Sequence, residues 1–343
     1  MSVLDDLKMI HERDGQDALG TAENQWQQLL HNFEIPRIEG EFHNIVYAGM
    51  GGSSLSASLS QTWPGHKLPF EICRTYDIPA YVNQNTLFIA SSFSGSTEET
   101  LSALAQAEEK GAKIVVIASG GKLTEIAEEK SYPLARLPNI PQPRYATLVI
   151  LKAVVQILIA SGLCDENKKT ELENLAQELE PNLKQYRGDV PTDQNPAKQL
   201  ALELTGSSIV VYASSLFYPV AYKWKISFNE NAKNVAWCNA YPEFNHNEFL
   251  GWSSHPVDKP YKVINLLSSF DHPQIQKRFE ISERMLSGKK PSAESVNLQG
   301  DTILKQMVYG TTFGDFVSLY LALINGLNPS PVDLIEKLKA ELA

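Results

Sequence analysis

A pattern of strand, small-residue turn and helix occurs twice in this chain, and it restricts the fold more than any other feature. In the first half, the apolar runs NIVYA (Asn44 to Ala48) and TLFIAS (Thr86 to Ser91) each end in such a turn, which opens a stretch of helical period. A third run, KIVVIA, extends from Lys113 to Ala118. Strands that alternate with helices form a parallel sheet covered on both faces, so we expect a doubly wound α/β domain.

The second half repeats this plan. SIVVYASSL (Ser208 to Leu216) follows NIVYAGMGGSSL in apolar pattern and turn, YKVINLLSSFDHPQ begins at Tyr261, and ESVNLQ (Glu294 to Gln299) stands where KIVVIA stood. The charged segment from Asp165 to Pro196 predicts a connecting helix followed by a linker. We therefore expect an N-terminal helical segment at 1–39, a first α/β domain at 40–163, the connecting helix and linker at 164–196, and a second α/β domain with a C-terminal helix at 197–343.

Composition and charge argue against several classes of function. A formal net charge of -10 without any basic block gives no support to a nucleic-acid partner. The apolar run from Ala146 to Leu163 carries Lys152 in its middle, which favours a buried helix over a membrane span. Cys73, Cys164 and Cys238 are too few and too far apart for a disulfide framework or a zinc site. We expect buried thiols, no metal, and a cytoplasmic protein that does not contact a membrane.

The turns after the matching strands differ between the two halves. The first reads SFSGST, with hydroxyls at Ser92, Ser94 and Thr97, and the second reads SFDHPQ, with an acid and a proline. Because the first turn leads into a helix N-terminus, its hydroxyls and the free N–H groups suit a phosphate. Ser96 and Glu99 have capping-box spacing, and the competing interpretation is that these serines only cap the helix.

A second candidate loop is GGSS, which contributes Gly51, Gly52 and Ser53 at the end of the neighbouring strand. Ligands of open parallel sheets bind at this edge, outside the carboxyl ends of the strands. Arg144 follows a proline-restricted segment, PQPRYA. The alternative interpretation of Arg144 is a solvated surface charge, as most arginines are.

The stretch FNENAKNVAWCNAYPEFNHNEFLGW crowds acids, amides and one histidine between aromatic residues. It contains Glu230 in N-E-N and His246 in N-H-N. Aromatic neighbours exclude water and shift pKa values, so the segment is a candidate chemical site. The alternative is a structural loop with helix capping around Asn245, and Glu243 and Glu248 are expected to be structural partners.

Taken together, GMGGSS, SFSGSTEET, PRYA, NENAK, PEFNHNEFLGW and the final GDFVSLYLALINGLNPSPVDLIEKLK resemble the bifunctional phosphoglucose/phosphomannose isomerase family. The resemblance runs in order from about Asn44 to Lys339. It implies two tandem SIS (sugar isomerase) domains, each a doubly wound, mainly parallel sheet flanked by helices. It also implies interconversion of glucose 6-phosphate and mannose 6-phosphate with fructose 6-phosphate through a cis-enediol, without a cofactor.

The resemblance implies a role for each candidate residue. The serine and threonine turn holds the sugar phosphate with the glycine loop close by, which places Ser92, Ser94, Thr97, Gly51, Gly52 and Ser53 in the phosphate site. Glu230 moves the proton between C2 and C1, Arg144 stabilises the intermediate, and His246 opens the sugar ring with help from Lys339. Lys337 is two residues from Lys339, so the resemblance does not decide which of the two lysines assists.

Related isomerases are homodimers in which the histidine reaches the neighbouring active site, so we expect a homodimer with shared sites. This chain departs from the family pattern at Ser54, where the glycine loop commonly continues GGSG, and at Phe93 and Ser96 of the turn. Two alternatives remain at this point. One is a SIS-domain regulator that binds a sugar phosphate without converting it, and the other is an isomerase of a different sugar phosphate.

Overall fold

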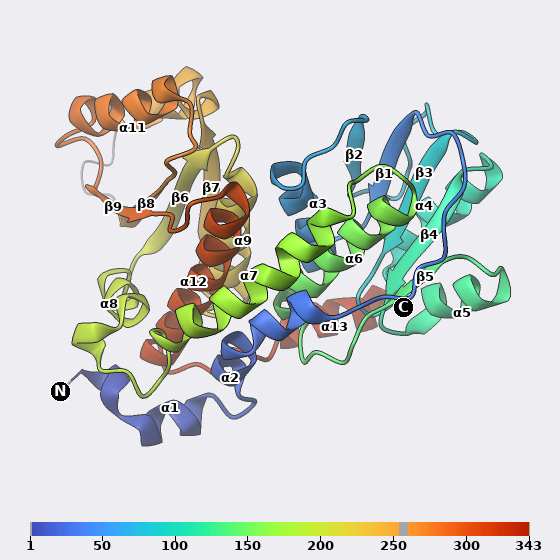
Figure 1. Ribbon diagram of the computed structural model, residues 1–343. Coiled ribbons are helices and arrows are strands. Elements are labelled where there is room, and N and C mark those ends of the chain that lie inside the picture. The colour runs from blue at the N-terminus through green and yellow to red at the C-terminus, as the bar shows by residue number, and fades with distance from the viewer. Residues whose placement is uncertain (1, 254–259, 343) are drawn as a thin grey trace. The chain divides into compact units, whose positions relative to one another are not determined.

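The structure of the protein is a computed structural model, which describes residues 2–253 and 260–342 (Figure 1). The chain divides into two compact units. We call residues 24–180 the first unit. The residues up to Glu23, together with those from Pro181 onward, form the second unit.

The first unit contains a five-stranded parallel sheet with the strand order β2-β1-β3-β4-β5. Its elements are η2 (Gln25–Leu30), β1 (Asn44–Ala48), α3 (Gly51–Thr62), β2 (Phe70–Cys73), β3 (Thr86–Ser91), α4 (Glu98–Glu109), β4 (Lys113–Ala118), α5 (Gly121–Glu129), β5 (Leu134–Arg136), η3 (Pro143–Tyr145), α6 (Thr147–Ala160) and α7 (Asn167–Lys184), the last of which continues past the unit's end.

Both faces of this sheet are buried, which explains why its central strands read as continuous apolar runs. Successive side chains of a strand point to opposite faces. Ile45 and Tyr47 therefore join one hydrophobic cluster with α6, while Val46 and Ala48 join another with α4. The predicted doubly wound sheet is confirmed, and β1, β3 and β4 begin and end at the predicted residues.

The apolar run from Ala146 onward forms the buried helix α6, as predicted. Lys152 in its middle is fully buried and forms an ion pair with Glu173 of α7 at 2.9 Å. A lysine within an apolar helix thus marks a buried ion pair between two helices.

The second unit contains a four-stranded parallel sheet with the order β7-β6-β8-β9. Its elements are η1 (Val3–Asp5), α1 (Leu7–Arg13), α2 (Ala18–Glu23), η4 (Thr192–Gln194), α8 (Pro196–Glu203), β6 (Ser208–Ser214), α9 (Tyr218–Glu230), β7 (Ala236–Tyr241), η5 (Glu243–His246), α10 (Glu248–Gly251), β8 (Tyr261–Leu267), α11 (Pro273–Met285), β9 (Ala293–Asn297), α12 (Ile303–Ile324) and α13 (Asp333–Leu342).

The two sheets confirm the internal repeat. Strand β6 lies between β7 and β8 as β1 lies between β2 and β3, and β9 follows β8 as β4 follows β3. On one face of the second sheet, Tyr241 at the end of β7 packs in one hydrophobic cluster with Phe244 and with Phe279 of α11. Helices α9 and α12 pack against each other, and Trp224 Nε1 of α9 donates to the Gly310 carbonyl at 2.8 Å.

Two expectations drawn from composition can be compared with the structure, one on membrane spans and one on the burial of the cysteines. Among the described residues, α12 is long and apolar enough to cross a membrane, but 83% of its apolar window is buried inside the protein, as in a core helix.

The three cysteines are free thiols, and only Cys73 is fully buried. The expectation of burial was wrong for Cys164 and Cys238, which are half-buried.

Candidate active site

The SFSGST turn joins β3 to α4 and folds around Ser92. The Ser92 hydroxyl is buried and lies 2.7 Å from the Thr97 hydroxyl and 3.5 Å from that of Ser94. It also accepts from the Gly95 N–H at 3.1 Å. The three hydroxyls assigned to phosphate binding are therefore gathered in one turn at the carboxyl end of a central strand.

Helix α4 begins without a side-chain cap. Its N-cap residue is Thr97, whose side chain makes no capping hydrogen bond, so the predicted capping box of Ser96 with Glu99 was wrong. Within the part of the chain that the structure describes, the N–H groups of Thr97, Glu98 and Glu99 have no hydrogen-bond partner. Unpaired N–H groups and the positive end of the helix dipole attract an anion.

The glycine loop lies against this turn. The Phe93 N–H donates to the Ser53 hydroxyl at 3.2 Å, which ties the two loops together and leaves the Ser53 proton to donate. Ser54, the departure from the family pattern, is fully buried, and its hydroxyl donates to the Gly51 carbonyl at 3.0 Å. The extra hydroxyl is thus turned into the loop, where it stabilises the backbone.

Arg144 joins the same group of residues. A Cβ added to Gly52 would lie 3.1 Å from the Pro143 carbonyl oxygen and 3.3 Å from the Arg144 nitrogen, so glycine lets the loop approach this backbone without displacing it. Arg144 is 1% exposed, and its guanidinium stacks over the Tyr145 ring at 4.7 Å. The alternative of a solvated surface arginine was therefore wrong.

A third loop, which the sequence reasoning did not single out, supports the turn. Gly95 has a positive φ of 72°, and a side chain there would meet the Gly120 carbonyl oxygen at 1.7 Å. The Ser119 hydroxyl donates to the Phe93 carbonyl, and the Leu123 N–H donates to that of Gly95 at 2.8 Å. The signal in the sequence was the pair Gly120-Gly121, which follows KIVVIA after Ser119.

Glu230 is the last residue of α9 in the second unit, and its neighbours in N-E-N-A-K hold this helix end. The Asn229 side chain accepts from the Ala236 N–H at 2.9 Å, and the Asn231 amide donates to the Ser318 hydroxyl at 2.9 Å. Lys233 donates to the carbonyls of Asn328 and Pro329 at 3.1 and 3.0 Å. The motif therefore fixes the backbone on both sides of the carboxylate.

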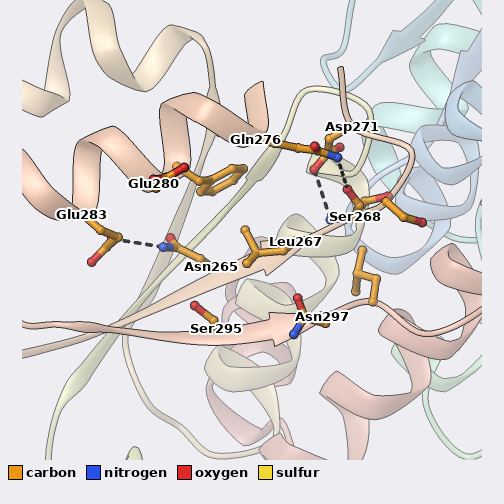
Figure 2. Close-up of a pocket in the computed structure, with 12 residues that line it drawn as sticks. Asn265, Leu267, Ser268, Asp271, Gln276, Glu280, Glu283, Ser295 and Asn297 are labelled. Atoms are coloured by element: carbon orange, nitrogen blue, oxygen red, sulfur yellow. Dashed lines mark hydrogen bonds between the residues drawn. The ribbon is translucent and has the colours of Figure 1, made fainter. Parts of the chain in front are cut away.

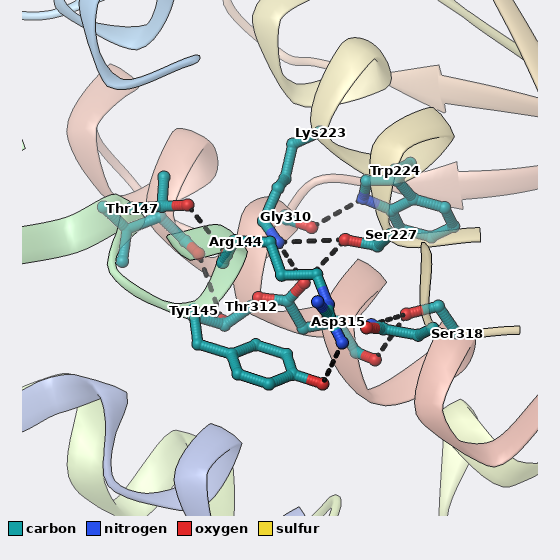
Figure 3. A network of polar contacts seen from close by, with 12 residues as sticks. Arg144, Tyr145, Thr147, Lys223, Trp224, Ser227, Gly310, Thr312, Asp315 and Ser318 are labelled. Atoms are coloured by element: carbon teal, nitrogen blue, oxygen red, sulfur yellow. Dashed lines mark hydrogen bonds and ion pairs between the residues drawn. The ribbon is translucent and has the colours of Figure 1, made fainter. Parts of the chain in front are cut away.

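A buried network anchors the same helix one to two turns earlier (Figure 3). Lys223 forms an ion pair with Asp315 of α12, and both side chains are fully buried. Ser227 donates to the same Asp315 oxygen at 2.8 Å. Sequence reasoning missed this network because a lysine and an aspartate 92 residues apart carry no local signal.

His246 is exposed at the end of η5, and its neighbours are anchored to the second unit. The Asn245 amide donates to the Ser282 hydroxyl at 2.9 Å, while Asn247 accepts from the Glu248 N–H at 2.6 Å and so caps α10. Glu243 accepts from Asn247, and Glu248 accepts from Asn239 at 2.7 Å. Both acids are structural partners, as predicted, and the cap lies at Asn247 instead of Asn245.

Lys339 lies in α13, but its side chain is outside the described part of the chain. Lys337 in the same helix is exposed. The structure therefore brings together the glycine loop, the serine turn and Arg144 in the first unit. Glu230, His246 and Lys339 lie on α9, η5 and α13 of the second unit.

Comparison with known families defines the class of protein. Residues 41–159 match the model described as "SIS domain", and residues 193–342 match "Bacterial phospho-glucose isomerase C-terminal SIS domain". The chain is thus a protein of two SIS domains, as predicted. It belongs to the bifunctional phosphoglucose/phosphomannose isomerase family.

Curated relatives support this assignment, and a solved structure shares the fold. The chain is 34% identical over 307 residues to "Bifunctional phosphoglucose/phosphomannose isomerase" of Caldicellulosiruptor bescii, with 88% of this chain and 90% of the relative covered. It is 31% identical to the protein of the same name from Aquifex aeolicus, covering 88% and 91%. A "glucose-6-phosphate isomerase like protein" from Thermus thermophilus shares the fold, with a TM-score of 0.67, 18% identity and 99% of each chain covered.

Proposed function

We propose that this protein interconverts fructose 6-phosphate with glucose 6-phosphate and with mannose 6-phosphate. The observation that carries the proposal is the serine turn at the uncapped start of α4, which offers hydroxyls and N–H groups to a phosphate. Membership of an isomerase family supplies the reaction class.

In this proposal the phosphate is bound away from the chemistry. Ser92, Ser94 and Thr97 donate to its oxygens, and Gly51, Gly52 and Ser53 line the approach. Binding energy gained at the phosphate orients carbons 1 and 2 of the sugar for proton transfer.

Proton transfer is assigned to the residues of the second unit and to Arg144. His246 moves a proton at the ring oxygen, assisted by Lys339. Glu230 then takes the proton from C2 and returns it to C1 through a cis-enediol. Arg144 stabilises the charge that develops on the oxygens of that intermediate.

The same intermediate accounts for two substrates. Glucose and mannose 6-phosphates differ only in configuration at C2, and the difference disappears when C2 becomes planar in the enediol. A site that accepts either orientation of C2 therefore serves both sugars.

A coupled assay tests the activity. Purified protein supplied with fructose 6-phosphate is expected to form both glucose 6-phosphate and mannose 6-phosphate. Formation of only one aldose would remove the dual assignment, and formation of neither would remove the proposed function.

The base assignment is tested by Glu230→Gln, with Glu294→Gln on strand β9 as a control that removes the same charge elsewhere in the second unit. Loss of general base catalysis is expected to lower kcat by roughly 100- to 10,000-fold while the affinity for sugar phosphate is kept. The control is expected to keep full activity. Normal turnover by Glu230→Gln would contradict the assignment.

We also propose a homodimer in which His246 acts in the partner's site. The Glu230→Gln and His246→Ala proteins are each expected to be inactive. Mixed dimers of the two carry one site with both residues intact, so co-refolding is expected to restore activity. A mixture that forms mixed dimers and stays inactive would show that both residues act within one chain.

A second candidate function has its own observation. The chain is 37% identical over 234 residues to "D-glucosamine-6-phosphate 4-epimerase" of Sulfolobus acidocaldarius, covering 67% of this chain and 71% of the relative. An amino-sugar phosphate is therefore a competing substrate. Conversion of glucosamine 6-phosphate with a higher kcat/KM than fructose 6-phosphate would favour this candidate.

A further inference from the structure

The second unit has a cavity at the place that corresponds to the phosphate turn of the first unit (Figure 2). Its volume is about 450 Å³, and it lies between α11 and strands β8 and β9. Strand β8 holds the position in its sheet that β3 holds in the other, and the turn after β8 contributes Ser268, Ser269 and Asp271 to the cavity wall.

The two turns begin with the same three residues and then diverge in charge. Ser91-Ser92-Phe93 corresponds to Ser268-Ser269-Phe270, so the phosphate-binding Ser94 is replaced by Asp271. Asp271 is 5% exposed. A carboxylate at this place repels a phosphate and attracts hydrogen-bond donors and cations.

The remaining charge of the wall is also negative. Glu280 and Glu283 of α11 line the cavity, and the lining residues include no lysine, arginine or histidine. Glu283 is neutralised by Lys290, whose Nζ lies 2.7 Å from Oε1 and 2.8 Å from Oε2. Asp271 and Glu280 form no ion pair within the described residues, so their charge remains available to a ligand.

An unpaired hydrogen-bond acceptor on β8 indicates that a ligand in the cavity supplies a hydrogen-bond donor. Asn265 is 1% exposed, and its amide nitrogen donates to Glu283 Oε1 at 3.1 Å. Its oxygen Oδ1 is buried and has no hydrogen-bond partner in the described chain. A buried carbonyl without a donor costs about 1–3 kcal/mol, and a ligand N–H or O–H that reached it would recover this cost.

The rest of the wall suits a hydroxylated ring. Phe279, Leu267 and Leu298 supply apolar surface, while Ser295, Asn297 and Gln276 supply polar groups. Apolar walls with a few placed polar groups are typical of small-molecule sites, and cavities from roughly 300 Å³ upward hold such ligands.

We propose that this cavity is a second small-molecule site, which binds a hydroxylated primary amine of the amino-sugar class without a phosphate. Asp271 and Glu280 attract the ammonium group, Asn265 Oδ1 accepts a hydrogen bond from the ligand, and Phe279 packs against its ring. The site uses none of the residues assigned to isomerisation, so a failure of the proposed function would not exclude binding at this site.

The test is a calorimetric titration of the full-length protein with glucosamine, and with glucose as the neutral control of the same shape. It is run at about pH 6.5, at which an amine with a pKa of roughly 8 is protonated. Glucosamine is expected to bind at least roughly tenfold more tightly than glucose, since one charged contact contributes about 1.4 kcal/mol or more. Equal binding of the two sugars, or no binding of glucosamine, would overturn the proposal.

Variants locate the site. The Glu280 carboxylate is exposed, so Glu280→Gln is expected to weaken glucosamine binding roughly two- to fivefold and to leave glucose binding unchanged, and Asn265→Leu is expected to weaken both. Glu294→Gln removes a similar charge from β9 without altering the cavity wall, and it is expected to bind glucosamine as the natural protein does. An unchanged far-ultraviolet circular dichroism spectrum in each variant shows that it is folded. Unchanged glucosamine binding in both Glu280→Gln and Asn265→Leu would place the amine elsewhere and contradict the proposal.

Discussion

The turn after β3 and the turn after β8 occupy the same place in two sheets of the same plan, yet their helices begin differently. Helix α4 starts without a side-chain cap, and its first N–H groups are left for a ligand. At α11, the His272 ring accepts from the Gln274 N–H at 3.1 Å, Pro273 has no N–H to satisfy, and Asp271 accepts from the Ser268 N–H at 3.2 Å.

Under the proposed function, this difference allows one repeat to bind an anion while the other does not. In the second turn, side chains of the protein take the hydrogen bonds that a phosphate would accept. A self-capped helix start favours stability, and an uncapped one favours binding.

The largest effect is expected when the acid of the second turn is placed in the first. Ser94→Asp is expected to raise KM for fructose 6-phosphate roughly 100- to 1,000-fold, because two like charges about 4 Å apart repel by about 4 kcal/mol near a protein surface. Steady-state kinetics measure the change. The reciprocal Asp271→Ser is expected to leave KM unaltered, and an equal change in both variants would remove the distinction between the turns.

A glycine is needed only in the first turn. Gly95→Ala places a side chain 1.7 Å from the Gly120 carbonyl at a positive φ, so the turn has to shift. We expect a loss of about 2 kcal/mol in the free energy of unfolding, together with a higher KM. Urea denaturation and kinetics check both. The matched change Gly111→Ala, also at a positive φ but with open space around it, separates backbone strain from the collision. If Gly111→Ala raises KM as much as Gly95→Ala, the collision is not the cause.

The two helix starts are expected to separate stability from binding. His272→Ala removes a cap and is expected to cost about 1 kcal/mol of unfolding free energy without changing KM. Thr97→Ala removes no cap but does remove the contact with the Ser92 hydroxyl, so it is expected to cost about 0.5–1.5 kcal/mol and also to raise KM roughly tenfold through a lost hydrogen bond to phosphate. Thermal denaturation and kinetics on both proteins check this, and an unchanged KM in Thr97→Ala would contradict a role of Thr97 in binding.

The smallest effect concerns pH. Burial raises the pKa of the Asp271 carboxyl, with the Ser214 hydroxyl and the Ser268 N–H opposing the shift. A carboxyl with a higher pKa in the folded state contributes stability at low pH, which is lost as the pH rises from the unfolded value of 3.8 through the raised folded value. Asp271→Asn is expected to remove this part of the pH dependence in denaturant unfolding. Identical curves for the two proteins would contradict the assignment.

The sequence predicted most of the first sheet because its central strands are apolar runs that end in glycine or serine. The strand Phe70–Cys73 was missed because only one of its residues is fully buried, and Leu134–Arg136 because three residues show no period. The gathering of Ser92, Ser94 and Thr97 followed from their position after a strand.

Other parts of the site depend on contacts between distant residues, which no local pattern reveals. The Lys223 to Asp315 ion pair that anchors α9 joins residues far apart in the chain, and the support of Gly95 by Gly120 joins two separate loops. The error at Ser96 has a physical reason as well. Capping-box spacing was present, but the helix begins two residues later, at Glu98, and its start is left open.

The most direct test of the central claim is a titration of isotope-labelled Glu230→Gln protein with fructose 6-phosphate, followed by amide NMR shifts. We expect saturable shifts at Ser94, Gly95 and Thr97, with the amides of Ser269, Phe270 and Asp271 unmoved. Saturable shifts confined to the second turn, or equal shifts in both turns, would contradict the claim that only the first turn binds phosphate.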